Sequence, residues 1–275
     1  MTKKTSFGGK LYTGLVFLFL YAPIAVLILF SFNSGKSTAV FEGFSLHWYE
    51  ELFRDAATLT AFKNSLIIAV ISSIISTVMG TAAATAIFGY KNKLVKSSIM
   101  TVTNIPMMNP EIVTGIAMML LFVFIGGMFG KTGTLGFTTL TIAHITFELP
   151  YVILNVLPKL KQTDAHLSEA AQDLGCTPFQ AFYKVVLPAI MPGIISGLMM
   201  AFTLSIDDFI ISYFVSGTSS QTLPIRIFSM TKRRVTPDMY ALSTLIFLAI
   251  LVLLVVSNVI SSRGDKKNAK KGGAK

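Results

Sequence analysis

The sequence predicts an all-α membrane protein with six transmembrane helices, from its composition, its long apolar runs and the placement of its basic residues. Of its 275 residues, 53% are hydrophobic and only 13% are charged, and the mean hydropathy is +0.68. A soluble domain carries roughly 25% charged residues. This composition therefore indicates a chain that resides mostly in lipid.

Six apolar runs have the length of about 20 residues that a membrane-spanning helix needs. The first follows a basic lead, as a signal peptide does, but its apolar run exceeds the roughly 7–15 residues of such a segment. No small-x-small cleavage site follows it, so we predict an uncleaved span. The predicted spans are Leu11–Phe32, Asn64–Tyr90, Ser98–Gly126, Leu135–Leu157, Pro188–Val215 and Tyr240–Ser262.

The Lys and Arg residues predict the orientation of these spans, because cytoplasmic loops carry an excess of both. With the N-terminus inside, 15 of the 23 basic residues are cytoplasmic. The organisation is then a cytoplasmic N-terminus (1–10), a transmembrane domain (11–262) and a basic cytoplasmic tail (263–275) that lies near anionic lipid. Within the domain, we predict an exterior segment at 33–63 and a cytoplasmic loop at 158–187.

The net charge of +10 raises the possibility of nucleic-acid binding, but the basic residues lie in short connections and in the tail. We therefore expect no nucleic-acid partner. The single cysteine, Cys176, excludes an internal disulfide. Glycine-rich phosphate loops and paired metal-ligand cysteines are absent from the sequence. We expect a non-enzymatic chain without a cofactor of its own, driven by a partner or by an ion gradient.

The loop at 158–187 contains a patterned polar stretch, EAAQDLGCTPFQAFYKVVLP. Asp164 is suited to cap a short helix at Ala165–Leu174 by accepting a free backbone N–H. Gly175 suits the left-handed turn that ends such a helix. Thr177 and Pro178 then predict the cap and the first position of a second helix.

The spacing E-A-A-x3-G-x9-[I/V]-x-L-P in this loop resembles the coupling-helix motif of binding-protein-dependent ABC import permeases. The resemblance implies a type I ABC importer permease fold, with a cytoplasmic helix that docks in a groove on a separate ATPase carrying Mg-ATP. The competing interpretation is an ordinary amphipathic helix at the membrane surface. The motif positions are Glu169, Ala170, Ala171, Gly175, Val185, Leu187 and Pro188.

Four carboxylates fall within the predicted spans: Glu111, Glu148, Asp207 and Asp208. An acid near the bilayer centre costs on the order of 3 kcal/mol, so such acids usually face a cavity or pair with a cation. Adjacent helix positions point about 100° apart, so at most one of the two aspartates faces the centre of a pathway. Glu148 has a local alternative, pairing with His144 one turn earlier. Acids without matching bases favour a cationic substrate, and polyamines carry separated ammonium groups.

Two exterior features each have two interpretations. Trp48 is a candidate cation–π contact for the substrate, or an aromatic anchor at the membrane interface. The basic cluster Lys232, Arg233 and Arg234 is a candidate docking site for an external binding protein, or a solvated loop.

Several longer runs resemble the family of spermidine/putrescine permease subunits of the PotC type: GFSLHWYEELF, MMNPEIVTGIAMML, AHITFELPYVIL, FTLSIDDFIISYFVSG and IFSMTKRRVTPDMYALSTLI. The resemblance implies a polyamine importer in a bacterial inner membrane, with both termini cytoplasmic. It implies as partners a homologous second permease, two copies of an ATPase and an extracytoplasmic polyamine-binding protein. The family's candidate polyamine contacts map onto Glu111, Asp207 and Asp208. Glu at position 111 replaces the Asp expected there, and Glu148 is an additional acid.

Three alternatives remain open at this stage. Import permeases for other small solutes share the coupling loop, but an anion route is not expected to carry four unpaired acids. An ion-coupled carrier needs no such loop and tends to have inverted repeats with broken helices, and the sequence indicates neither. An intramembrane aspartyl protease needs two carboxylates that face each other from different helices, and Asp207 and Asp208 are adjacent.

Overall fold

A computed structural model of the chain describes residues 7–35, 37, 40–164, 166–218, 220–232, 237–252 and 255. Within these ranges the regular structure is helical, apart from one isolated bridge between Asn33 and Phe44. The chain forms two compact units. The first comprises the residues up to Leu59 together with Ile227–Leu251, and the second is built on Thr60–Arg226.

The first unit contains the exposed helix α1 (Phe7–Ser31), the short helix α2 (His47–Arg54) and a compact segment between them, which belongs to the segment predicted to be exterior. Asn33 organises this segment, because its side-chain oxygen accepts the Glu42 N–H at 2.7 Å while its amide nitrogen donates to the Val40 carbonyl at 2.8 Å. The Trp48 indole N–H donates to the Asn33 carbonyl at 2.7 Å. The unit also contains the apolar helix Pro237–Val252.

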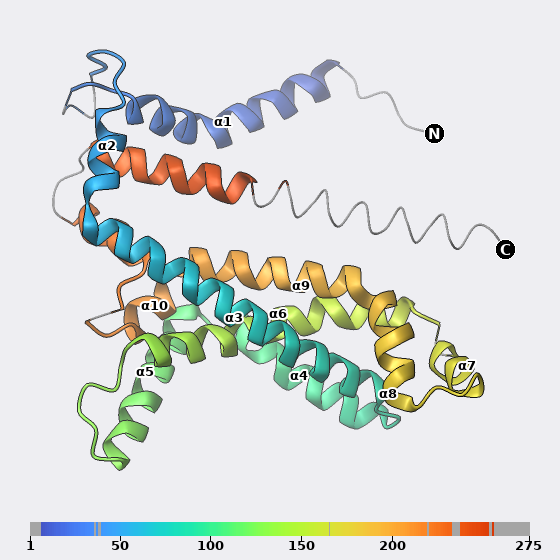
Figure 1. Cartoon of the computed structure of the whole chain (residues 1–275). Helices are drawn as coiled ribbons and strands as arrows, with labels where there is room; N and C mark the ends of the chain where they lie inside the picture. Colours follow the sequence, from blue (N-terminus) through green and yellow to red (C-terminus); the bar gives the residue numbers. More distant parts are fainter. Residues whose placement is uncertain are drawn as a thin grey trace. The chain divides into compact units, whose positions relative to one another are not determined.

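The second unit is a bundle of long helices with α6 at its centre (Figure 1). Twelve residues of α6 are buried, spread over several of its faces. Helix α9 packs on α6 through small residues that recur every fourth position: Gly193, Gly197, Ala201 and Ser205. Such stripes allow close backbone approach between membrane helices. The helices are α3 (Ala56–Gly89), α4 (Lys93–Met108), α5 (Glu111–Met128), α6 (Phe137–Gln162), α9 (Leu187–Asp207), α10 (Ile210–Val215) and the first residues of α11 (Leu223–Thr231).

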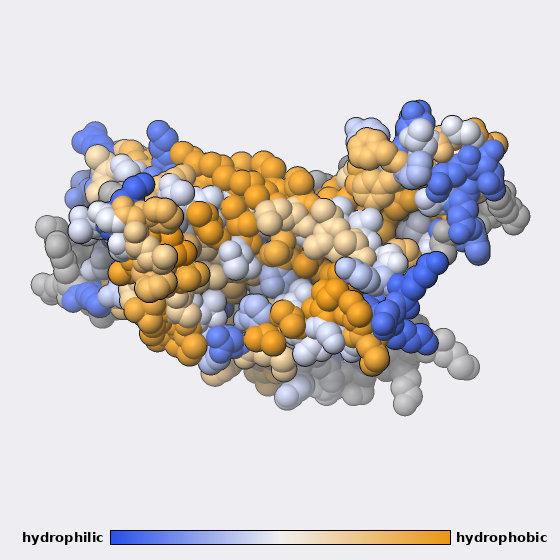
Figure 2. All heavy atoms as spheres, turned by 90° about the horizontal axis from the view of Figure 1, so that it is seen from below, coloured by the Kyte–Doolittle hydropathy of each residue, from blue (hydrophilic) through white to orange (hydrophobic). Residues whose placement is uncertain are grey.

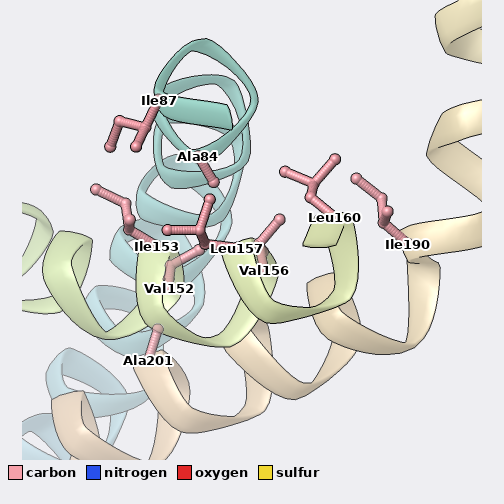
Figure 3. Packing of buried hydrophobic residues seen from close by; sticks show 9 residues of the cluster. All are labelled: Ala84, Ile87, Val152, Ile153, Val156, Leu157, Leu160, Ile190 and Ala201. Carbon is pink, nitrogen blue, oxygen red and sulfur yellow. The ribbon is translucent and has the colours of Figure 1, made fainter. Parts of the chain in front are cut away.

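One apolar cluster joins α3, α6 and α9 (Figure 3). Val152 of α6 is fully buried in it. A Cβ atom built on Gly80 of α3 would lie 2.6 Å from a Val152 methyl group, and one built on Gly197 of α9 would lie 3.3 Å from it. Two glycines from different helices therefore make room for this valine. The cluster consists of Ala84, Ile87, Val152, Ile153, Val156, Leu157, Leu160, Ile190 and Ala201.

The predicted all-α membrane fold is confirmed. Among the described residues, five helices are long and apolar enough to cross a membrane, and Pro237–Val252 is a shorter apolar helix. The end of the predicted sixth span, Tyr240–Ser262, lies outside the described residues, as do residues 1–6 of the predicted cytoplasmic N-terminus and the basic tail (263–275). The five long helices are Gly8–Ser31, Ala56–Gly89, Glu111–Met128, Phe137–Gln162 and Pro178–Asp207.

The prediction of one continuous helix was wrong for two of the spans. The span Ser98–Gly126 is broken, because α4 ends at Met108 and α5 begins at Glu111. Asn109 is extended (ψ 138°), as expected for a residue that precedes a proline. The span Pro188–Val215 is broken at Asp208, which is extended (ψ 117°). Helix breaks, which the sequence analysis did not predict, are therefore present.

Candidate functional site

The first candidate site residue, Glu111, lies at the break between α4 and α5. It is the first residue of α5 and its side chain is exposed. It lies within electrostatic reach of the Tyr151 hydroxyl on α6. The site therefore combines a free carboxylate with a helix break and a nearby phenol.

The second break separates the two neighbouring aspartates. Asp207, the last residue of α9, is exposed, whereas Asp208 is only 8% exposed. The two oxygens of Asp208 accept backbone N–H groups of α10, from Ile211 at 3.3 Å and from Ser212 at 2.7 Å. Asp208 therefore caps the N-terminus of α10, where unpaired N–H groups favour an anion. Asp207 is left free of this task.

The two breaks lie on elements that pack closely. A Cβ atom on Gly115 of α5 would lie 3.1 Å from the Phe214 ring and 3.5 Å from the Ile210 carbonyl, both on α10. Gly115 is one turn after Glu111, and Ile210 follows closely on Asp207 and Asp208. The start of α5 therefore lies beside the start of α10.

Glu148 lies inside the bundle and has no exposed surface. Two hydroxyls of α3 donate to it, Ser72 Oγ at 2.6 Å to one oxygen and Ser76 Oγ at 2.8 Å to the other. His144 lies 4.0 Å from the same carboxylate. Glu148 thus has partners within the bundle, which places it apart from the exposed acids Glu111 and Asp207.

His144 is the centre of this buried polar group. Its Nδ1 lies 2.7 Å from Ser205 Oγ on α9, and its Nε2 lies 3.0 Å from Ser212 Oγ on α10. Nε2 is also 3.5 Å from the Asp208 carboxylate. Sequence reasoning missed the serines. The available signal was the four-residue spacing of Ser72 and Ser76, which puts both hydroxyls on one face of an apolar helix.

The two candidates that were predicted to lie on the exterior side have specific contacts in the first unit. Trp48 is only 6% exposed, with its N–H bonded to Asn33, so the ring is part of the fold of this segment. The Lys232 ammonium lies 4.7 Å from the centre of the Phe228 ring and the lysine is exposed. Arg233 and Arg234 lie outside the described residues.

The patterned loop forms two short helices and a π-helical turn: α7 (Leu167–Asp173), α8 (Pro178–Ala181) and η1 (Phe182–Val186). Gly175 has the left-handed conformation predicted for it (φ +90°). Thr177 Oγ1 accepts the Gln180 N–H at 3.3 Å, which completes the predicted cap of α8. The first helix is shorter than predicted. Asp164 accepts the His166 N–H at 3.0 Å, and the helix begins at Leu167.

The loop extends beyond one end of α6 and α9 (Figure 1), where hydrophilic residues gather next to an apolar surface (Figure 2). Of the motif residues, Glu169, Ala170 and Gly175 are exposed and Ala171 is buried. Large apolar side chains are also exposed here: Leu174 is 88% exposed, and Phe179 and Tyr183 are mostly exposed. An apolar surface on a polar loop is typical of a site that binds another protein.

His166 gives α7 a predicted pH dependence. Its Nδ1 lies 2.9 Å from a Glu169 oxygen, and this hydrogen bond, with the charges of Glu169 and Asp164, raises the pKa of His166. Because the pKa is raised, the contact stabilises α7 fully below the ordinary histidine pKa of about 6.5. This stabilisation is lost as the pH rises through the pKa that His166 has in the folded chain. We expect α7 amides to exchange more slowly at pH 6 than at pH 8, after correction for intrinsic rates. His166→Asn should abolish the difference, and equal protection at both pH values in the parent would contradict the assignment.

Comparison with known proteins identifies the relatives of this architecture. Residues 76–268 match the family model described as binding-protein-dependent transport system inner membrane component. The putrescine transport system permease protein PotI of Escherichia coli K12 is 38% identical over 251 residues, covering 91% of this chain and 89% of PotI. The spermidine/putrescine transport system permease protein PotC of Haemophilus influenzae is 36% identical over 250 residues, covering 91% of this chain and 95% of PotC.

A solved structure shares the fold. A chain of a bacterial ABC transporter involved in the import of the acidic polysaccharide alginate superposes with a TM-score of 0.71 at 18% identity. The superposition covers 92% of this chain and 93% of that chain. The chain therefore has the fold of an ABC importer permease, in agreement with the implication drawn from its coupling-loop motif.

Proposed function

Because this chain belongs to the family of binding-protein-dependent transport system inner membrane components, we propose that it is the permease subunit of an ATP-driven polyamine importer. Relatives named for putrescine and for spermidine/putrescine transport align over about nine-tenths of its length. In this proposal the chain does no covalent chemistry and binds no cofactor. It provides a route for the cation and transmits motion from the ATPase.

The observation that carries the proposal is a pair of exposed carboxylates at neighbouring helix breaks. Among the described residues, neither Glu111 nor Asp207 forms an ion pair with a Lys or Arg. A helix C-terminus carries a partial negative charge, and α4 and α9 both end at these breaks. Asp207 is the last residue of α9 and adds its carboxylate to such a terminus, and Glu111 supplies a second carboxylate at the other break. Two separated negative sites suit a molecule with two separated ammonium groups.

The coupling loop supports the second half of the proposal, the link to ATP. Its exposed apolar side chains lie beyond the end of the bundle, where a cytoplasmic ATPase is able to dock. ATP binding then closes the ATPase pair, and α7 transmits the movement to α6 and α9, which flank the loop. The spans thereby turn the pathway outward, and hydrolysis returns it to the inside.

The complete assembly, as we propose it, is a bacterial inner-membrane complex with both termini of this chain in the cytoplasm. It contains a homologous second permease, two copies of the ATPase and an extracytoplasmic polyamine-binding protein. Lys232, Arg233 and Arg234 are the candidate contacts for the acidic surface of that binding protein. Membrane lipid surrounds the exposed apolar helices, and α1 is the most exposed of the candidate spans.

The alternative proposal is an import permease for another small solute. The family description names dependence on a binding protein and leaves the solute open. An ion-coupled carrier shares the broken helices, but the family membership and the coupling loop favour the importer.

Uptake of labelled putrescine and spermidine tests the proposal in cells stripped of their own polyamine import. The cells express the ATPase, the second permease and the binding protein, with or without this chain. We expect accumulation that requires both this chain and a functional ATPase. No polyamine uptake, together with ATP hydrolysis stimulated by another ligand, would point to the alternative solute. Uptake that continues after the ATPase has been inactivated would point to an ion-coupled carrier.

Leu174→Asp tests the docking surface of the loop. Burying the new carboxylate in an apolar groove without a partner is costly, so we expect the ATPase to be lost during purification of the complex. Leu94→Asp is the matched control, because Leu94 is similarly exposed (79%) but lies on α4, outside the loop. Retention of the ATPase by Leu174→Asp, or equal loss with both variants, would contradict docking at this surface.

A further inference from the structure

A buried chain of polar side chains connects four helices of the second unit. It runs from Glu148 through Ser72, Ser205 and His144 to Ser212 and Asp208. Ser72 and Ser205 are joined by a contact of 3.2 Å between their hydroxyls. All six side chains are buried. Placing ionisable groups at membrane depth costs free energy, and such groups usually have a function. The proposed route through Glu111 and Asp207 does not explain the presence of His144.

His144 bridges the break between α9 and α10. Ser205, bonded to Nδ1, lies two residues before Asp207 on α9, and Ser212, bonded to Nε2, lies on α10. The backbone at Asp208 is extended, which interrupts the helix between α9 and α10. The imidazole therefore supplies a cross-link that the broken helix lacks. The Asp208 cap on the Ser212 N–H completes it from the other side.

We propose that His144 is a positioning residue for the substrate pathway. By holding Ser205 and Ser212 on the two sides of the break, it fixes the direction in which Asp207 points. The inference rests on the proposed function for its consequence in transport, but the positioning itself is independent of the substrate. Asp208 belongs to the same cross-link, so the two neighbouring acids have different tasks.

The direction of the hydrogen bonds ties the imidazole to Glu148. Ser72 donates its only hydroxyl proton to Glu148, so its contact with Ser205 needs the Ser205 proton. Ser205 then has no proton left for His144, and Nδ1 must donate to it. Each hydrogen bond in this series of buried side chains thus has one donor when Nδ1 carries a proton. With Glu148 ionised, the serines thereby place a proton on Nδ1.

The test of positioning uses a thiol at the position of the exposed acid. In a Cys176→Ser background, Asp207→Cys is labelled with a membrane-impermeant maleimide in the assembled complex, with His144 intact or replaced by Phe. We expect the labelling rate to change at least about fivefold in His144→Phe, because that ring fills the space without bridging the break. An unchanged rate would overturn the proposal. This readout requires no polyamine transport, so it separates the proposal from the proposed function.

Uptake kinetics supply the second readout. If His144 acts through Asp207, His144→Phe raises the apparent KM for polyamine, and adding it to Asp207→Asn produces little further loss. Losses that multiply in the double variant would indicate a merely structural role and overturn the inference.

Ser212→Ala covers the case in which His144→Phe does not assemble, because it removes only the hydroxyl that contacts Nε2. We expect it to change the labelling rate in the same direction by a smaller factor. His144→Gln, which places an amide near Nε2, should restore part of the parent rate. No change in Ser212→Ala would contradict the bridge.

Discussion

Asp207→Asn is expected to lower polyamine uptake at least about tenfold while the complex still assembles. Asp207 is exposed at the end of α9, and the substitution keeps its size while removing its charge. A hydrogen bond to a charged group contributes about 1.5–3 kcal/mol, and 1.4 kcal/mol corresponds to a factor of ten in affinity. The loss should fall mainly on the apparent KM, measured as uptake against external polyamine concentration.

The neighbouring acid provides the matched control for this experiment. Asp208→Asn keeps an oxygen that accepts the Ser212 N–H, and Asn is as good a helix cap as Asp. We therefore expect a smaller increase in KM than for Asp207→Asn. Asp207→Glu, which keeps the charge, should retain most of the uptake. If Asp208→Asn abolished uptake while Asp207→Asn left it unchanged, the buried Asp208 would be the acid that contacts the substrate.

The local structure of the patterned loop at 158–187 was predictable because its signals act over a few residues. Gly175 adopts a left-handed turn, and the Thr177 cap uses a donor three residues away. The membrane spans followed from composition for a similar reason, since about 20 apolar residues suffice to specify one. Among the described residues, the five long helices and the shorter helix Pro237–Val252 each overlap one of the six predicted spans, although two of those spans are broken.

The helix breaks and the partners of Glu148 could not be predicted with the same arguments. Hydropathy does not reveal the break, because the chain is apolar on both sides of the pair Asp207 and Asp208. The break depends on the Asp208 side chain, which accepts a backbone N–H group of α10. His144, from another helix, also lies beside this carboxylate. Ser76 meets Glu148 from 72 positions away in the sequence. Only the packing of α3 on α6 brings those hydroxyls to the acid.

Gly80→Ala is the substitution with the largest expected effect on stability. The new methyl group would lie 2.6 Å from a side-chain carbon of Val152, which is fully buried and is also approached by Gly197 from the other side. Valine is stiff at χ1 and has no space into which to turn, so α3 must move away from α6. Overpacking of this kind costs about 1–3 kcal/mol. The melting temperature of the purified complex should fall accordingly.

A double-mutant cycle with Val152→Ala distinguishes this clash from a general loss of packing. Val152→Ala alone leaves a void and should destabilise the bundle, but it removes the methyl groups that meet Gly80. In that background, Gly80→Ala should therefore cost little or be stabilising, with a coupling energy of about 1 kcal/mol or more. Gly89→Ala serves as the control on the same helix, because its added Cβ meets no atom within 4 Å. Additive losses from Gly80→Ala and Val152→Ala would mean that α3 does not reach α6 through this valine. The placement of Ser72 and Ser76 against Glu148 would then lose its support as well, since the same helix contact holds all three.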